Sequence, residues 1–130
     1  MNHLVGRILL ALVFLVAGVR KLMAPAASAG YLAKLGFPAP EVMVWVAIAF
    51  ELGGAILLIL GWKTRWGALA LALFTLIATF AAHRFWEFDA AQYANQMNHF
   101  LKNLAIVGGM VLLAATGPGP LSVDGRRRGG

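Results

Sequence analysis

Glu51 is the residue in this sequence whose position most strongly predicts chemistry. It lies inside an apolar run from Val42 to Gly61, and it is the only ionisable residue of that run. About twenty apolar residues are enough to cross a bilayer as a helix. A carboxyl group near the middle of a membrane is unfavourable unless it is neutral or paired. We therefore expect Glu51 to mark a functional site and to have a partner on another apolar segment.

Five further residues are candidates for the same site. They are basic or amide-bearing side chains near the ends of the other apolar segments: Lys21, His83, His99, Lys102 and Asn103. Lysine side chains have long apolar stems that can reach into a bundle. Imidazole and amide groups can hydrogen-bond to the carbonyl oxygens of a ligand. Four separate segments must therefore pack together to bring these groups to one site.

Composition places this chain in a membrane. Of its 130 residues, 61% are hydrophobic and only 12% are charged, whereas soluble domains carry roughly 25% charged residues. The net charge of +6 is scattered apart from one cluster at Arg126, Arg127 and Arg128. Nucleic acid is excluded as a partner, because phosphate tracking needs a continuous basic stripe. The absence of cysteine excludes disulfides, thiol catalysis and thiolate-held clusters.

The apolar segments predict an all-α integral membrane four-helix bundle within residues 1–120. Spans are expected at about residues 4–22, 42–61, 66–83 and 98–116, with a short interfacial helix in the first loop. The first span is expected to be an uncleaved transmembrane helix and not a signal peptide, because Arg20 and Lys21 follow it where a cleavage site should be. Asp89 with Gln92 three residues later suits the start of the fourth helix. Residues 121–130 are expected to be a disordered basic tail.

The distribution of lysine and arginine predicts the orientation. With both termini in the cytoplasm, six of these residues lie inside and five lie outside. The inner set is Arg7, Lys63, Arg65, Arg126, Arg127 and Arg128, and the outer set is Arg20, Lys21, Lys34, Arg84 and Lys102. This topology places Glu51 and its five candidate partners together in the outer half of the bundle.

Four interpretations of this polar group remain open. The first is a structural ion pair that fixes helix register, and the second is a pocket for a quinone headgroup. In the pocket, His83, His99, Lys102 or Asn103 would bond to carbonyl oxygens while Glu51 relays protons. A b-type haem held by His83 and His99 is disfavoured, because solvated histidines are commoner at a membrane interface. Transport of a small anion would require these four short helices to form a homo-oligomer. No metal site is expected.

Short sequence motifs along almost the whole chain resemble the DoxX family of small bacterial inner-membrane proteins. The motifs are Gly18-Val19-Arg20-Lys21, Gly36-Phe37-Pro38-Ala39-Pro40, Glu51-Leu52-Gly53-Gly54, Gly61-Trp62-Lys63-Thr64-Arg65, His83-Arg84-Phe85-Trp86, Phe100-Leu101-Lys102-Asn103-Leu104-Ala105 and Gly117-Pro118-Gly119-Pro120-Leu121-Ser122-Val123-Asp124. The resemblance implies four transmembrane helices. Where members of the family have an attributed function, it is usually redox, and one branch includes the quinone-reducing subunit of a thiosulfate:quinone oxidoreductase.

The residues and the resemblance together give one leading hypothesis and one alternative. The leading hypothesis is an inner-membrane protein that binds a quinone-like lipid and serves a membrane or peripheral oxidoreductase subunit. In it, Glu51 has the catalytic role, and Lys21, His83, His99, Lys102 and Asn103 bind the ligand. The alternative is a non-catalytic membrane anchor or assembly subunit whose buried ion pair is structural.

Overall fold

The computed structural model describes residues 1–129, and within them the chain is helical and has no strand. The helices are α1 (Asn2–Met23), α2 (Pro25–Lys34), α3 (Pro40–Leu60), α4 (Thr64–Ala82), the short 3-10 helix η1 (Phe85–Glu87), α5 (Ala90–Thr116) and α6 (Val123–Arg128). Four of them, α1, α3, α4 and α5, are long and apolar enough to cross a membrane. The predicted all-α membrane fold is confirmed, as is the short helix in the first loop.

Local sequence signals explain where several helices begin and end. Pro25 and Pro40 occupy the first positions of α2 and α3, where a proline removes no helical hydrogen bond. Gly61 ends α3 with a φ of 66°, a backbone conformation that favours glycine. Asp89 caps α5 by accepting a hydrogen bond from the Gln92 backbone N–H over 3.1 Å. The expected start of the fourth long helix is therefore confirmed.

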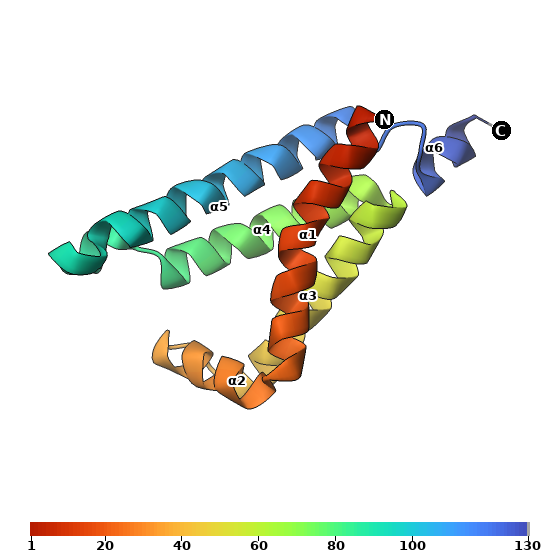
Figure 1. Ribbon diagram of the computed structural model, residues 1–130. Helices are drawn as coiled ribbons and strands as arrows, with labels where there is room; N and C mark the ends of the chain where they lie inside the picture. Colours follow the sequence, from red (N-terminus) through yellow and green to blue (C-terminus); the bar gives the residue numbers. More distant parts are fainter. Residues whose placement is uncertain (130) are drawn as a thin grey trace.

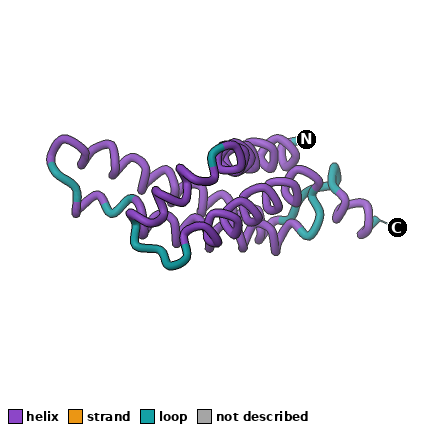
Figure 2. Tube along the Cα trace, turned by 90° about the horizontal axis from the view of Figure 1, so that it is seen from below, coloured by secondary structure: helices purple, strands orange, loops and turns teal. Residues whose placement is uncertain are grey.

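The long helices form two antiparallel pairs. Helix α1 packs along α3, and α4 packs along α5, with α3 also touching α4. The pairs meet at the end of the molecule that carries both termini, and they diverge toward the opposite end (Figure 1). Short loops join the helices, as the view from below shows (Figure 2). The diverging end is where the predicted site residues lie.

Two apolar clusters hold this arrangement. The larger one joins the four long helices where the pairs meet, and its fully buried members include Ala11, Leu58, Leu71 and Met110. The smaller one seats α2 on α3 through Ala29, Val44 and Ile48. Because α2 is fixed on α3, it forms a wall at the diverging end of the bundle.

The expectation of a disordered tail is wrong for the residues that the structure describes. Residues 123–128 form α6, and the Ser122 side chain caps that helix by accepting from the Gly125 N–H over 2.9 Å. The carboxylate of Asp124 accepts from the backbone N–H groups of Lys63 and Thr64, each over 2.9 Å. Unpaired N–H groups at a helix start attract a carboxylate, so the tail docks on the start of α4. Residue 130 lies outside the described residues.

The burial of Arg7 was not predicted from the sequence, where Arg7 was only counted among the cytoplasmic lysine and arginine residues. Its side chain is fully buried and donates to the carbonyl oxygens of Leu58 (2.8 Å) and Ile59 (3.0 Å). It also donates to the carbonyl oxygen of Leu121. The last carbonyl groups of a helix have no helical partner and favour a cation. Arg7 therefore ties α1 to the end of α3 and to the C-terminal segment.

Candidate functional site

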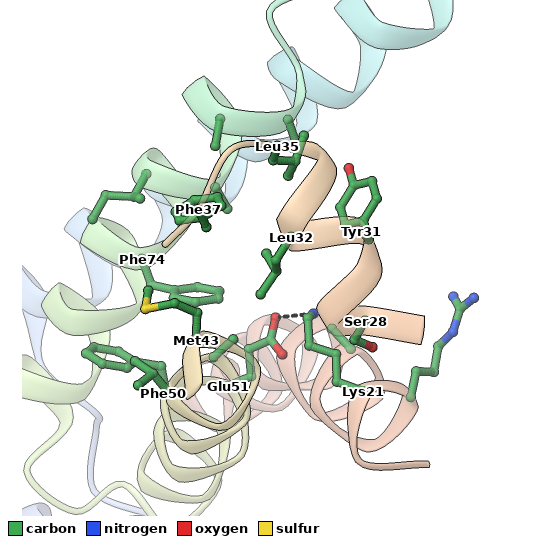
Figure 3. A pocket seen from close by; sticks show the side chains of 18 of the residues that line it. Lys21, Ser28, Tyr31, Leu32, Leu35, Phe37, Met43, Phe50, Glu51 and Phe74 are labelled. Atoms are coloured by element: carbon green, nitrogen blue, oxygen red, sulfur yellow. Dashed lines mark hydrogen bonds and ion pairs between the residues drawn. The ribbon is translucent and has the colours of Figure 1, made fainter. Parts of the chain in front are cut away.

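A cavity of about 700 Å³ lies at the diverging end, between α1, α2, α3 and α4. Its walls are mostly apolar, with Leu32, Leu35 and Phe37 on one side and Leu73, Phe74 and Ile77 on another. Figure 3 shows the labelled part of this lining around the side chains of Lys21 and Glu51. Tyr31 and Phe50 also line the cavity and remain 52% and 42% exposed. The cavity is therefore open at the side of the bundle.

Lys21 and Glu51 form an ion pair on the wall of this cavity. The distance from Lys21 Nζ to Glu51 Oε1 is 2.9 Å, and the dashed line in Figure 3 marks it. The Glu51 side chain is 5% exposed, whereas that of Lys21 is 28% exposed. The lysine ammonium has three N–H donors, and one of them is used in the pair. Lys21 can thus present further donors to a ligand in the cavity.

The second carboxylate oxygen of Glu51 is buried without a hydrogen-bond partner among the described residues. An unsatisfied buried acceptor is unfavourable, so this oxygen is suited to take up a proton. A buried carboxyl group that is paired with a single cation can be either protonated or ionised. That arrangement suits proton transfer as well as structural pairing.

Close packing of α1 on α3 brings the pair together. Gly18 lies one helical turn before Lys21, and a Cβ added to it would lie 2.7 Å from Leu52 and 3.3 Å from the Glu51 Cβ. Only a glycine lets the two backbones approach this far. Gly18 and Lys21 lie three residues apart and so share one face of α1, and the close contact at Gly18 therefore places Lys21 beside Glu51.

His83 lines the same cavity from the end of α4. Its Nδ1 lies 2.7 Å from the Gln96 Oε1. Its ring stacks on that of His99, with centroids 4.9 Å apart and an angle of 19° between the planes. His83 therefore connects the cavity with a polar cluster between the end of α4 and the first half of α5.

The structure divides the predicted constellation. Lys21, Glu51 and His83 line the cavity, whereas His99, Lys102 and Asn103 do not. Lys102 is exposed and Asn103 is partly buried, both on α5. The divergence of the two helix pairs explains this division, because it carries α5 away from α1 and α3. The roles of all six residues in ligand binding or catalysis stay predictions.

The two histidines do not fit a haem. Two axial ligands must approach the iron from opposite faces of the macrocycle, with the ring nitrogens pointing at each other. In this structure the His83 and His99 rings lie face to face at 4.9 Å, and His83 Nδ1 is bonded to Gln96. A macrocycle has no room between two stacked rings. The haem interpretation, already disfavoured, gains no support from the geometry.

Sequence reasoning missed the aromatic residues of the cavity. Phe50 on α3 and Phe74 on α4 stack with centroids 5.9 Å apart and an angle of 14° between the planes. Both line the cavity, together with Tyr31 and Phe37 from the first loop. The sequence shows that Phe50 directly precedes Glu51. Its contact with Phe74 on α4 depends on how the two helix pairs meet, which the sequence alone does not show.

Comparisons with known proteins agree with this fold. The DoxX family pattern matches residues 3–84. The chain is 36% identical over 123 residues to the inner membrane protein YphA of Escherichia coli (strain K12), which covers 95% of this chain and 88% of YphA. It is 39% identical over 121 residues to the inner membrane protein YqjF of the same organism, covering 93% of this chain and 88% of YqjF.

A more distant similarity reaches a eukaryotic protein. A Surfeit locus protein 4 homolog of Schizosaccharomyces pombe is 30% identical over 128 residues, which cover 97% of this chain but 37% of that protein. No solved structure matches the chain at a comparable level of significance. The family match covers more than half of the chain, and the two bacterial relatives match it nearly end to end. The chain belongs to the DoxX family and is an integral membrane protein.

Proposed function

We propose that this protein binds a quinone-like lipid in the cavity between α1, α2, α3 and α4 and serves a membrane redox assembly. One observation carries the proposal: the Lys21–Glu51 pair, whose carboxylate is buried, forms part of the wall of an open, mostly apolar cavity of about 700 Å³. Small-molecule sites combine apolar walls with a few placed polar groups. The aromatic residues Phe50 and Phe74 offer flat surfaces beside the pair, against which a quinone ring can stack.

The chemistry of the pair suits a quinone headgroup. A quinone carbonyl accepts hydrogen bonds only, and Lys21 has N–H donors beyond the one given to Glu51. Reduction of a quinone to a quinol takes up two electrons and two protons. The electrons come from a partner oxidoreductase subunit. Both protons come from water: Glu51 relays one to the carbonyl oxygen that Lys21 polarises, and the second carbonyl oxygen takes up the other directly. The isoprenoid tail leaves the cavity at its open side into the bilayer.

We place the protein in the bacterial inner membrane with both termini in the cytoplasm. The named E. coli relatives are inner membrane proteins, and both termini of this chain lie at one end of the bundle (Figure 1). The cavity then faces the outer half of the membrane. A reporter that fluoresces only in the cytoplasm, fused to the C-terminus, should be fluorescent. If instead a phosphatase that is active only in the periplasm showed activity when fused to the C-terminus, the orientation would be the opposite one.

A second function is a membrane anchor whose ion pair is structural. The observation that favours it is the near-complete burial of Glu51, which is 4% exposed and joins α3 to α1 through Lys21. Ion pairs and hydrogen bonds between helices commonly stabilise membrane bundles. In this case the protein tolerates loss of the Glu51 charge without losing the binding of its partner protein.

Ligand-induced stabilisation in lipid nanodiscs tests the proposal. Decylubiquinone at about 100 times its dissociation constant should stabilise the protein by about 2.7 kcal/mol. Glu51→Gln should weaken this saturable rise in melting temperature. Glu41→Gln is the matched control, because Glu41 lies at the exposed start of the same helix and outside the cavity. If the wild-type protein shows no shift across a wide concentration range, the quinone function is wrong.

A further inference from the structure

Gln96 fixes which nitrogen of His83 carries the proton. The Gln96 Oε1 lies 2.7 Å from His83 Nδ1, and an amide oxygen can only accept a hydrogen bond. In neutral imidazole one nitrogen is a donor and the other is an acceptor. Nδ1 therefore carries the hydrogen, and Nε2 is left with a free lone pair. Within residues 1–129 no protein group bonds to His83 Nε2.

The stacked ring of His99 holds His83 in this orientation. The two rings lie 4.9 Å apart, with 19° between their planes, so one face of the His83 ring is covered. Swinging the ring away from its present plane would break both this stack and the bond to Gln96, and a half-turn of the ring in place would break the bond to Gln96. His83 lines the cavity from the end of α4. Lys21 on α1 and His83 on α4 thus both line the cavity, the first with N–H donors to spare and the second with Nε2 unbonded.

We propose that Gln96 is a positioning residue, which holds His83 in the Nδ1–H form so that Nε2 accepts a hydrogen bond from a hydroxyl group of the bound lipid. The inference rests on the proposed function and names the form of the ligand. A quinone carbonyl can only accept, so it can bond to Lys21 but not to His83 Nε2. A quinol hydroxyl can donate as well as accept. The cavity therefore prefers the reduced, hydroxyl-bearing headgroup.

Nitrogen NMR of the histidines tests the positioning role without any ligand. The protein is labelled with ¹⁵N-histidine in nanodiscs and measured above pH about 8, where an ordinary imidazole is neutral. The His83 signals are assigned by their loss in His83→Asn. Wild type should show the Nδ1–H form. Gln96→Glu keeps an acceptor and should retain it, whereas Gln96→Leu should shift His83 to the Nε2–H form. An Nε2–H signal in the wild-type protein would overturn the inference.

A pair of redox-inert probes tests the ligand preference. 4-Nonylphenol has a hydroxyl donor, and 4-nonylanisole has the same ring and tail without it. Wild type and Gln96→Glu should bind the phenol about tenfold more tightly, which is the effect of one hydrogen bond. Gln96→Leu should lose this preference. Gln92→Leu is the matched control, since Gln92 is exposed on the same helix and lies outside the cavity.

The outcomes separate the two proposals. Equal affinity of the wild-type protein for both probes, with decylubiquinone still binding, would overturn the role of Gln96 and leave the quinone site intact. Failure of all three compounds to bind would overturn the quinone site and the ligand preference together. Melting temperatures of the two Gln96 variants show whether the fold survives. If Gln96→Leu unfolds, the comparison of wild type with Gln96→Glu and the two probes still decides the preference.

Discussion

The guanidinium of Arg7 donates to the carbonyl oxygen of Leu58 over 2.8 Å, which joins a residue near the start of α1 to the last turn of α3. The same side chain reaches Ile59 and Leu121, so three separate segments meet on one buried cation. Gly61 lies beside it, and a Cβ there would come within 2.5 Å of the Arg7 guanidinium. Arg7 thus ties α1, α3 and the C-terminal segment together at this end of the bundle, whereas the cavity lies at the opposite end.

Replacing Arg7 by methionine should destabilise the protein by about 2 kcal/mol, because buried carbonyl groups lose a charged donor. The change keeps an unbranched side chain of similar reach, so it tests the hydrogen bonds more than the packing. Thermal unfolding in nanodiscs measures the effect. Arg126→Met is the control, since Arg126 is exposed on α6. Equal melting temperatures for wild type and Arg7→Met would show that the buried guanidinium does not hold these segments together.

The docking of Asp124 on the start of α4 predicts a pH dependence. Burial would raise the pKa of Asp124, but the hydrogen bonds from the backbone N–H groups of Thr64 and Lys63 outweigh it and lower the pKa below its ordinary value. A group whose folded pKa is lowered stabilises the fold fully above its ordinary pKa. That stabilisation is lost as the pH falls through the lower folded value. The melting-temperature difference between wild type and Asp124→Asn should therefore be constant from neutral pH down to about 5 and shrink in stronger acid.

A difference that stays the same in strong acid would mean that the charge of Asp124 does not cap α4. Asp89→Ala serves as a control for helix capping in general, because Asp89 caps α5 by accepting a single hydrogen bond from the Gln92 N–H and alanine cannot accept one. Loss of its cap should not alter the response of the Asp124 variant. Effects at the two helices should be additive, since they share no partner.

Apolar runs of membrane-spanning length predicted the long helices, and the residue pattern within them predicted part of the site. The face that carries Gly18 and Lys21 was readable at a spacing of three to four residues, and the lone carboxyl of Glu51 required a partner. Lys21 was one of two lysines proposed for that role, and the structure selects it over Lys102. The deciding factor is the close contact of α1 with α3, which no single helix reveals.

Tertiary arrangement accounts for what sequence reasoning did not resolve. The predicted topology places Glu51 in the same half of the membrane as His99, Lys102 and Asn103. In the structure the two helix pairs diverge, and this separates the three residues of α5 from the cavity. Arg7 lies four residues before Ala11 on the buried face of α1, so its burial could have been read from the same periodicity. Docking of the tail depends on partners about 60 residues away, and no local signal predicts it.

Two adjacent glycines of α3 should respond differently to the same substitution. A Cβ on Gly54 would lie 2.6 Å from Leu71 Cγ, whereas Gly53 has nothing within 4 Å. Gly54→Ala should destabilise the protein by about 1–3 kcal/mol through overpacking, since Leu71 is fully buried. Gly53→Ala should be neutral or slightly stabilising, because alanine favours a helix. Equal unfolding temperatures for the two variants would contradict the close contact of α3 with α4.

A double-mutant cycle on Lys21 and Glu51 separates a structural pair from independent residues. Lys21→Met leaves a buried carboxylate without its cation and should destabilise the protein by about 3 kcal/mol. Adding Glu51→Gln removes that charge, so the double variant should be more stable than Lys21→Met alone. Thermal unfolding of the four proteins in nanodiscs gives the coupling free energy. The same cycle with Lys34 in place of Lys21 should show none, because Lys34 is exposed and has no contact with Glu51. Additive effects for Lys21 and Glu51 would contradict the ion pair at 2.9 Å.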